Sequence, residues 1–410
     1  MAEQIDSKIP KIRFKGFEGE WEDKTLGDLG SFKNGMNFGK EAMGHGNPFV
    51  NLQNVFGQFE VDDKKLELAE SSSVQRREYN LLKGDVLFIR SSVKPEGVGE
   101  TALITKTLMD TTYSGFIIRY RPEVMMSHDF NRIAYRTTVV RKQILANASR
   151  SANTNINQNA LKKIALGIPS FEEQTQIGGY FRELDRLIGL HQRKHAKLVA
   201  LKKAMLQKMF PQPGATTPEI RFKGFSEDWN KEKLETISDS YSGGTPSVGN
   251  RAYYGGAIPF IRSAEINAIS TELTITELGL RDSAAKMVSE GDILYALYGA
   301  TSGEVGISQI NGAINQAVLA IKPHSGYSSQ FIATWLRNRK VEIIGTYLQG
   351  GQGNLSGAIV KSLHVDLPCI EEQQKIGTHF RQLDELISKH AIQLQKLKQI
   401  KSACLEKMFV

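Results

Sequence analysis

Two polar stretches of the chain hold side chains that can read the edges of nucleic-acid bases. They are Asn153–Asn157, which contains three asparagines, and Gln349–Asn354, which mixes glutamine and asparagine with glycine. Asparagine, glutamine and arginine form paired hydrogen bonds with purine edges, and glycine lets a backbone approach phosphate closely. These stretches therefore suggest sequence-specific nucleic-acid binding, although any one such residue is more often part of an ordinary solvated loop.

Further candidates lie beside two apolar runs that follow Gly-Asp pairs, Val86–Ile89 and Ile293–Ala296. Together, the candidate DNA-binding residues are Asn37, Arg90, Ser91, Ser92, Lys94, Asn153, Asn155, Asn157, Thr245, Ser247, Arg262, Tyr298, Thr301, Ser302, Gln352 and Asn354.

Motifs for catalysis on DNA or nucleotides are incomplete. Asn47-Pro48-Phe49 lacks the second proline of the loop with which N6-adenine methyltransferases hold the amine. Gly35–Glu41 is one residue short of a phosphate-binding loop and has Glu41 where Ser or Thr would bind magnesium. The two cysteines and eight histidines show neither zinc-site spacing nor a triad pattern. We therefore expect no catalytic, cofactor or metal site; an enzyme with a divergent active site and a two-armed protein adaptor remain as alternatives.

Composition bounds the class of protein without deciding its partner. The chain has 410 residues and a net charge of +8, but residues 219–367 carry 13 basic and 15 acidic side chains. Charge thus permits DNA binding and does not demand it, because phosphate contact needs only a local basic face. No run of eighteen apolar residues and no apolar stretch near the start are present, so we expect a cytoplasmic protein without a membrane partner.

The chain contains an internal repeat. Pro10–Trp21 recurs as Pro218–Trp229, 208 residues later, with the shared letters Ile-Arg-Phe-Lys-Gly-Phe. Pro169–Ile177 recurs as Pro368–Ile376, 199 residues later, with the shared pattern Pro-x-x-Glu-Glu-Gln-x-x-Ile. Similar ends therefore enclose two middle segments that have diverged, which indicates two different recognition surfaces on a common frame.

The stretch that begins at each copy of the Pro-x-x-Glu-Glu-Gln pattern, here called the rear segment, is predicted to form one long helix. Its apolar residues alternate at spacings of four and three, which gives the helix an apolar seam. Roughly 38 residues at 1.5 Å each give a rod on the order of 57 Å. We expect the two helices to pair antiparallel, with a homodimeric coiled coil as the alternative. His191 and His390 occupy matching positions on the two seams. We expect them to fix the register of the helices or to be core residues whose hydrogen bonds are satisfied. The predicted seam and subunit-docking residues are Phe181, Leu184, Ile188, His191, Leu198, Phe380, Leu383, Ile387, His390, Leu394 and Leu397.

The two middle segments read as mixtures of short strands and a few helices. Their Gly-Asp runs match each other, as do Asn47–Val50 and Ile258–Ile261. Such segments, punctuated by Gly and Pro, predict one twisted, partly closed sheet in each copy and not a doubly wound nucleotide fold. A helix is expected at Asp129–Asn147, with a counterpart at Ser328–Tyr347.

In the order of these features, the chain resembles the specificity (DNA-recognition) subunits of type I restriction–modification systems. The resemblance spans nearly the whole chain and includes Ser242–Ser247 followed by Ile258–Ile261, besides the front segments, the Gly-Asp strands and the Pro-x-x-Glu-Glu-Gln helix starts. It implies a subunit without catalysis that reads a bipartite, asymmetric site in double-stranded DNA. It also implies docking to two methyltransferase subunits, which bind S-adenosylmethionine and methylate adenine at N6, and to restriction subunits that use ATP and Mg.

The expected fold class is α+β, with two globular α/β target-recognition domains, two long antiparallel helices as a coiled-coil spacer, and an internal pseudo-two-fold repeat. The expected boundaries are 1–168 for the first recognition domain, 169–213 for the first helix, 214–367 for the second domain and 368–410 for the second helix. Half-sites on one face of DNA repeat about every 34 Å, which is shorter than the predicted rod. The helices could therefore set the number of unread base pairs.

Overall fold

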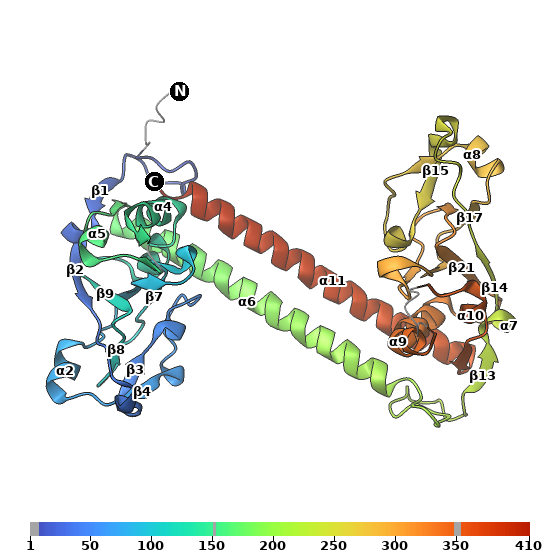
Figure 1. The fold of residues 1–410 in the computed structure, drawn as a ribbon, viewed down its shortest axis with the longest axis horizontal. Helices are drawn as coiled ribbons and strands as arrows, with labels where there is room; N and C mark the ends of the chain where they lie inside the picture. Colours follow the sequence, from blue (N-terminus) through green and yellow to red (C-terminus); the bar gives the residue numbers. More distant parts are fainter. Residues whose placement is uncertain (1–7, 151–152, 348–353) are drawn as a thin grey trace. The chain divides into compact units, whose positions relative to one another are not determined.

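The computed structural model describes residues 8–150, 153–347 and 354–410. They form two compact units, drawn in Figure 1. Unit 1 comprises the residues up to Gln192 together with Ile392–Val410, and unit 2 comprises Arg193–Ala391. The expected boundaries separate helices from inserts along the chain, whereas these units divide both long helices. Each unit therefore contains the start of one long helix and the end of the other.

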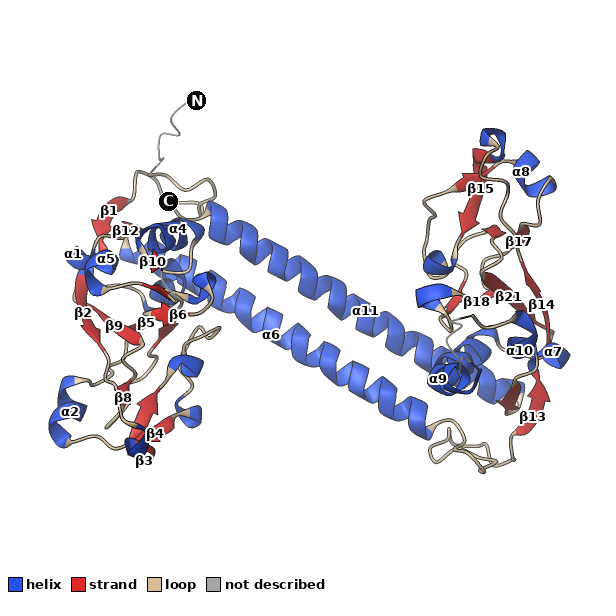
Figure 2. Cartoon of the chain, viewed as in Figure 1, coloured by secondary structure: helices blue, strands red, loops and turns tan. Residues whose placement is uncertain are grey.

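Both long helices lie within the ranges expected from the sequence, 169–213 and 368–410, and are somewhat shorter than those ranges. Helix α6 covers Phe171–Lys208 and α11 covers Ile370–Lys407, 38 residues each, and both stand out in Figure 2. In unit 1, Asp185 near the start of α6 pairs with Lys401 near the end of α11, at 2.6 Å. In unit 2 the corresponding pair is Asp384 with Lys202, where early α11 meets late α6. Both pairs require the helices to run antiparallel.

The predicted seam is buried most fully near the start of each helix. Phe181, Leu184 and Ile188 of α6 are buried, as are Phe380 and Leu383 of α11. The later seam positions are half-buried, namely His191, Leu198, Ile387, His390, Leu394 and Leu397. Leu397 packs against the core of unit 1 and Leu198 against that of unit 2.

Both inserts are built on a four-stranded antiparallel sheet with the same strand order. In unit 1 this sheet comprises β2 (Gly30–Asn34), β9 (Ile117–Pro122), β5 (Val86–Ile89) and β7 (Thr101–Leu103). In unit 2 it comprises β14 (Ser238–Ser242), β21 (Val318–Pro323), β18 (Ile293–Ala296) and β19 (Val305–Ile307). All residues of β5 and β18 are buried, which explains why these strands read as continuous apolar runs.

Each insert also contains a second, mixed sheet, whereas we expected a single sheet. In unit 1 it has the order β4 (Glu67–Ala69), β3 (Met43–Val50), β8 (Thr112–Tyr113), and in unit 2 the order β16 (Thr274–Ile275), β15 (Tyr254–Ile261), β20 (Gly312–Ile314), β17 (Lys286–Val288). β3 pairs with β8, and β15 with β20, in parallel. Such pairing joins strands that are distant in sequence, so the local pattern does not reveal it.

The smaller elements complete the units. Short antiparallel pairs join β1 (Glu22–Thr25) to β12 (Ala165–Ile168), and β13 (Asn230–Lys233) to β22 (His364–Leu367). The shorter helices are α1 (Leu26–Leu29), α2 (Ser73–Glu78), α3 (His128–Ala134), α4 (Thr138–Asn147) and α5 (Gln158–Lys162) in unit 1, and α7 (Leu234–Ile237), α8 (Glu277–Arg281), α9 (Ser329–Tyr347) and α10 (Gly357–Lys361) in unit 2.

The helix expected at Asp129–Asn147 is two helices, α3 and α4, whereas its counterpart α9 is continuous. Thr137 interrupts the first copy. Its hydroxyl donates to the carbonyl of Ala134 (3.0 Å) and accepts from the amide of Val140 (3.5 Å). This side chain competes with the helical backbone and starts a β-branched run, Thr137–Val140, that helices disfavour.

The Gly-Asp pairs are tight turns. Gly84 and Gly291 have φ of 96° and 92°, a backbone conformation that favours glycine. The Asp85 carboxylate accepts the Leu82 amide and pairs with Arg121 at 2.7 Å. Each turn thus presents the start of a buried strand.

The repeated Pro-x-x-Glu-Glu-Gln segments join each long helix to its insert. Gln174 donates to the carbonyl of Pro169 (3.0 Å) and accepts the amide of Ser127 (3.0 Å). In unit 2, Gln373 makes the same bonds to Pro368 and Ser328. The glutamine side chain therefore holds the start of the insert helix against the start of the long helix.

Each long helix ends in the same three residues, Lys208-Met209-Phe210 after α6 and Lys407-Met408-Phe409 after α11, and the Phe of each closes an aromatic cluster. Phe409, after α11, packs in unit 1 against Trp21, Phe130 and Phe181, with ring centroids 5.7–6.0 Å away. Phe210, after α6, packs in unit 2 against Trp229, Phe331 and Phe380 at 5.6–6.0 Å. In each unit, a repeated front segment and the ends of the long helices thus contribute to the same core.

Candidate nucleic-acid interface

In unit 1, strand pairing brings several predicted residues together. The strands β10 (Ser149–Arg150), β11 (Thr154–Asn155) and β6 (Ser91–Ser92) form a small antiparallel sheet. Asn155 lies opposite Ser91, and Thr154 lies opposite Ser92. The polar loop thus folds back onto the end of the Gly-Asp strand, and the two stretches form one polar surface.

Asn37 and Arg90 adjoin this sheet around Gly115. The Arg90 amide donates to the carbonyl of Phe116 (2.8 Å), and its guanidinium donates to that of Gly115 (3.4 Å). A Cβ on Gly115 would lie 2.1 Å from the Asn37 side-chain oxygen, so the amide of Asn37 covers this glycine. Asn37 and Arg90 therefore contact the same glycine from two different segments.

The remaining predicted residues of unit 1 lie at the margins. Lys94 is exposed and precedes a 3₁₀ turn at Pro95–Gly97. Asn153 is exposed, and its carbonyl accepts from the Asn155 side chain at 2.9 Å. Asn157 caps α5 by accepting the amide of Ala160 at 2.9 Å, so it has a structural role.

In unit 2, Tyr298 and Asn354 form an isolated antiparallel bridge directly after β18. The adjoining amide of Leu355 donates to the carbonyl of Leu297 at 2.9 Å. Tyr298 and Asn354 are both exposed. The end of the Gly-Asp strand therefore again meets the polar segment that precedes the short helix of the frame, here α10.

Thr245 lies next to this bridge. Its hydroxyl donates to the side chain of Gln316 (2.6 Å), and the carbonyl of the following Ala317 accepts the amide of Leu297 (2.8 Å). A threonine, a glutamine, a tyrosine and an asparagine are thus gathered at one end of the sheet in unit 2.

Other predicted residues of unit 2 are engaged elsewhere. Arg262 pairs with Glu265 at 2.9 Å and Glu272 at 2.5 Å, and hydrogen bonds to Glu265 and then Glu272 raise the pKa of its guanidinium. Ser302 is buried and donates to the carbonyl of Leu297 at 3.0 Å, while Thr301 donates to that of Tyr298 at 3.4 Å. Ser247 is exposed, and Gln352 lies outside the described residues.

The two sites occupy equivalent positions of the repeat. Each lies where the Gly-Asp strand ends, beside the segment after the first strand of the sheet and the segment before the last short helix. The side chains at these positions are Asn37, Arg90, Ser91 and Asn155 in unit 1, and Thr245, Leu297, Tyr298 and Asn354 in unit 2. The backbone frame is shared, whereas three of the four side chains differ.

Phe116 and Gln316 belong to these sites but were not among the residues predicted from the sequence; they occupy neighbouring positions of the repeat, because Phe116 corresponds to Ala317 and Gln316 to Gly115. Phe116 is 52% exposed and follows Gly115, and Gln316 holds Thr245. Neither lies in an asparagine-rich loop or beside a Gly-Asp strand, so no local signal distinguishes them. Aligning the two copies through the strands β9 and β21 that follow would have indicated both.

This duplicated arrangement has a match among known protein families. Residues 18–200 and 226–401 each match the family described as the type I restriction modification DNA specificity domain. The chain belongs to this specificity family. The two matched ranges contain the two inserts and most of both long helices, so the internal repeat is a repeat of the specificity domain.

One curated relative matches nearly the whole chain, and another matches about half of it. The putative type I restriction enzyme MjaX specificity subunit of Methanocaldococcus jannaschii is 26% identical over 404 residues, covering 92% of this chain and 91% of the relative. The type I restriction enzyme MjaIX specificity subunit of the same organism is 27% identical over 192 residues, covering 45% of this chain and 44% of the relative. A solved type I restriction–modification S subunit from M. genitalium shares the fold, with a TM-score of 0.62, 15% identity, and coverage of 98% of this chain and 99% of that one.

Within the described ranges, no helix is long and apolar enough to cross a membrane.

Proposed function

We propose that this specificity-family chain reads a bipartite, asymmetric site in double-stranded DNA, one half with each unit. The observation that carries the proposal is the pair of equivalent polar sites with different side chains. Arg90 and Asn155 offer donors suited to purine edges, whereas Tyr298 and Thr245 offer hydroxyls and an aromatic ring. A common frame with different polar groups is what two distinct half-sites require.

We further propose that the chain is not catalytic and docks two methyltransferase subunits through its helical regions. The helices support this proposal because they keep large apolar side chains exposed, among them Val199, Leu201, Leu386 and Ile392 at 38–66% exposure. Exposed apolar residues of this kind favour protein partners. In the proposed assembly S-adenosylmethionine lies on the methyltransferase subunits, and ATP and Mg lie on the restriction subunits.

The decisive experiment co-expresses the chain with its neighbouring methyltransferase subunit and maps N6-methyladenine by single-molecule sequencing. Methylation at one bipartite motif with a fixed gap, lost when this gene is deleted, is the expected result. Exchanging residues 20–165 for the corresponding insert of another specificity subunit should change one half of the motif only. Methylation unaffected by the deletion would refute the proposal and favour a protein adaptor, and S-adenosylmethionine binding by the chain alone would favour an enzyme.

The long helices are proposed to set the gap between the half-sites. Adding about one helical turn to both α6 and α11 at the unit boundaries, near Gln192 and Ala391, should lengthen the unread segment and leave both half-sites unchanged. The same methylation map measures this result. An altered half-site with an unchanged gap would contradict a spacer role.

A further inference from the structure

Unit 1 contains a cluster of three cationic groups around one aromatic ring. Lys401 of α11 places its ammonium nitrogen 4.0 Å from the centroid of Phe59, and Arg136 places its guanidinium carbon 4.1 Å away. Arg132 of α3 is 5.2 Å from the same centroid. Partly desolvated cations over an aromatic ring are attracted by its quadrupole. Phe59 is therefore held between Lys401 of α11 and the two arginines, Arg132 and Arg136, of the insert.

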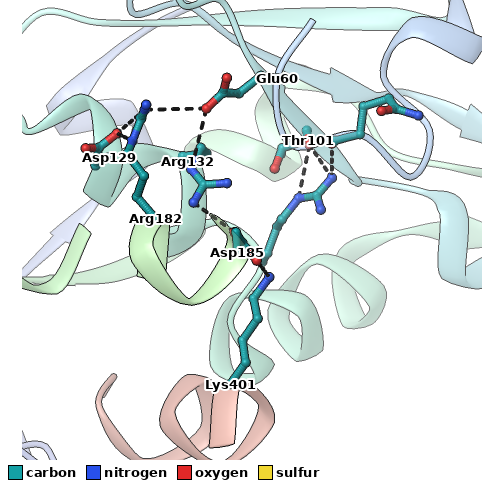
Figure 3. A network of polar contacts seen from close by, with 9 residues as sticks. Glu60, Thr101, Asp129, Arg132, Arg182, Asp185 and Lys401 are labelled. Atoms are coloured by element: carbon teal, nitrogen blue, oxygen red, sulfur yellow. Dashed lines mark hydrogen bonds and ion pairs between the residues drawn. The ribbon is translucent and has the colours of Figure 1, made fainter. Parts of the chain in front are cut away.

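Ion pairs of the neighbouring residue Glu60 and of Arg132 and Lys401 connect this part of the insert to both long helices (Figure 3). Asp185 of α6 accepts from Lys401 at 2.6 Å and from Arg132 at 2.9 Å. Arg132, 5% exposed at its side chain, also lies 3.7 Å from Glu60, and Arg182 of α6 lies 3.4 Å from Glu60. The segment that contains Phe59 and Glu60 is therefore tied to α3, α6 and α11.

The same segment is bonded to the loop that follows the proposed reading strand β6. Arg136 donates to the carbonyls of Gln58 and Thr101, and burial lowers the pKa of its guanidinium to about 10. The amide of Gly57 donates to the Glu100 carboxylate at 2.8 Å. The loop from residue 94 to 101 therefore takes its position partly from the Phe59 segment.

That loop adjoins the proposed DNA-reading residues directly. A Cβ on Gly97 would lie 2.4 Å from the hydroxyl of Ser92 and 2.8 Å from the ring of Phe56. Ser92 belongs to β6, and Lys94 opens the loop. A continuous series of contacts thus runs from Lys401 through Phe59 and Gly97 to the polar sheet of unit 1.

Unit 2 keeps only part of this arrangement. The pair of Lys202 with Asp384 corresponds to Lys401 with Asp185, at 2.5 Å. The position of Arg132 is occupied by Ala333, two residues after the core aromatic Phe331 as Arg132 is after Phe130. The ion pair between the long helices is therefore common to both units. Arg337, at the position of Arg136, also bonds to the insert in unit 2 by donating to the carbonyl of Val305 at 2.9 Å. Only the direct pair of Arg132 with Asp185 belongs to unit 1 alone.

We propose that Lys401 is a positioning residue for base reading by unit 1, acting through Asp185 and Phe59 on the loop from residue 94 to 101. Lys202, its counterpart, stabilises unit 2 without affecting which bases that unit reads. This inference rests on the proposed function, because it assigns a control element to one of the two proposed reading sites.

The test compares Lys401→Met with Lys202→Met in the full chain assembled with its methyltransferase partner. Methionine keeps the aliphatic length and removes the charge. Methylation rates are measured on the cognate site and on sites with one changed base pair in either half. Lys401→Met should lower discrimination in one half by about tenfold, the loss typical of one misplaced base contact, and leave the other half unchanged. Lys202→Met should leave discrimination in both halves unchanged. Lys401→Arg, which keeps the positive charge, should discriminate as well as the unsubstituted chain.

Hydrogen exchange on the full chain without DNA provides a readout that does not depend on base reading. The amide of Leu103, bonded to the carbonyl of Phe59 at 3.0 Å, and that of Gly57 should exchange faster in Lys401→Met and not in Lys202→Met. Equal effects of the two substitutions on exchange and discrimination would overturn the inference while leaving the proposed function intact. A wild-type assembly without any sequence preference would overturn both.

Discussion

Glu173 and Glu372 have almost fully buried carboxylates, and each pairs with the arginine of a repeated front segment. Arg13 donates to Glu173 at 2.7 and 2.8 Å, and Arg221 donates to Glu372 at 2.8 and 2.7 Å. In the sequence, these glutamates are visible only as part of the repeated Pro-x-x-Glu-Glu-Gln pattern, in which negative charge suits the start of a helix. Their partners lie 160 and 151 residues away, so the local sequence pattern reveals neither the ion pairs nor the role of the front segments.

Removal of one partner from such a pair should be strongly destabilising. Arg221→Ala leaves the Glu372 carboxylate buried without its partner, so the free energy of unfolding should fall by about 3–5 kcal/mol. Chemical denaturation monitored by tryptophan fluorescence measures this change. The double variant Arg221→Met with Glu372→Gln should lose less stability than Arg221→Ala, and an equal or larger loss would contradict this account.

Arg90 and Asn157 test whether reading and folding are separate properties of the polar segments in unit 1. Arg90→Ala should reduce discrimination at one base position by about 1–3 kcal/mol, because its guanidinium adjoins the polar sheet. Asn157→Ala removes a helix cap, so it should reduce stability by about 1 kcal/mol and leave specificity unchanged. Relative methylation of single-substitution sites and thermal unfolding distinguish the two. A specificity change in Asn157→Ala alone would reverse these assignments.

At the scale of elements, α6 and α11 approach the inserts closely because each has a glycine in its first half. A Cβ on Gly178 would lie 2.5 Å from the backbone nitrogen of Phe130, and one on Gly377 would lie 2.8 Å from the Cβ of Gln330. Gly179, one residue further along α6, faces open space. Gly178 therefore permits α6 to pack closely against the insert, whereas Gly179 does not contribute to this packing.

These adjacent glycines provide a matched test. Gly178→Ala should reduce the free energy of unfolding by about 1–3 kcal/mol, because α3 must move away from α6. Gly179→Ala should increase it by up to about 1 kcal/mol through helix propensity. Thermal unfolding of both variants checks the signs. Stabilisation by Gly178→Ala would mean that α3 moves aside without strain.

Elements with strong local signals were predictable. The long helices were predicted because their period, acidic starts and flanking prolines agree, and β5 and β18 because a glycine turn precedes an apolar run. The sites were only partly predictable, because they depend on pairings between distant segments such as β6 with β11. Asn155 and Tyr298 were suggested by local composition, whereas Phe116 and Gln316 become visible only when β9 and β21 are in place.

At the scale of the whole molecule, both units are assembled from the same parts. The order of these parts along the chain differs between the units by a circular permutation. Each combines a front segment, an insert, the start of the helix that follows it and the end of the other helix. In unit 2 the Lys-Met-Phe segment precedes the front segment, whereas in unit 1 it follows everything else. Phe210 and Phe409 therefore have the same role with opposite positions along the chain.

Phe409→Ala and Phe210→Ala should be equally disruptive, each to its own unit. Loss of a buried aromatic ring lowers the free energy of unfolding by about 3–5 kcal/mol. Hydrogen exchange on the full chain should show loss of protection at Trp21 for Phe409→Ala and at Trp229 for Phe210→Ala. Loss of protection in both units from either substitution would show that they unfold together.

The order of the parts along the chain also affects biosynthesis. All residues of unit 2 are translated before Ile392–Val410, which complete unit 1. While the ribosome is still adding them, Trp21 and Phe130 lack the ring of Phe409, and Asp185 lacks Lys401. Domains usually fold in the order of their synthesis. Here the half that begins to be translated first is completed last, so its aromatic core lacks one ring until the end of α11 has been added.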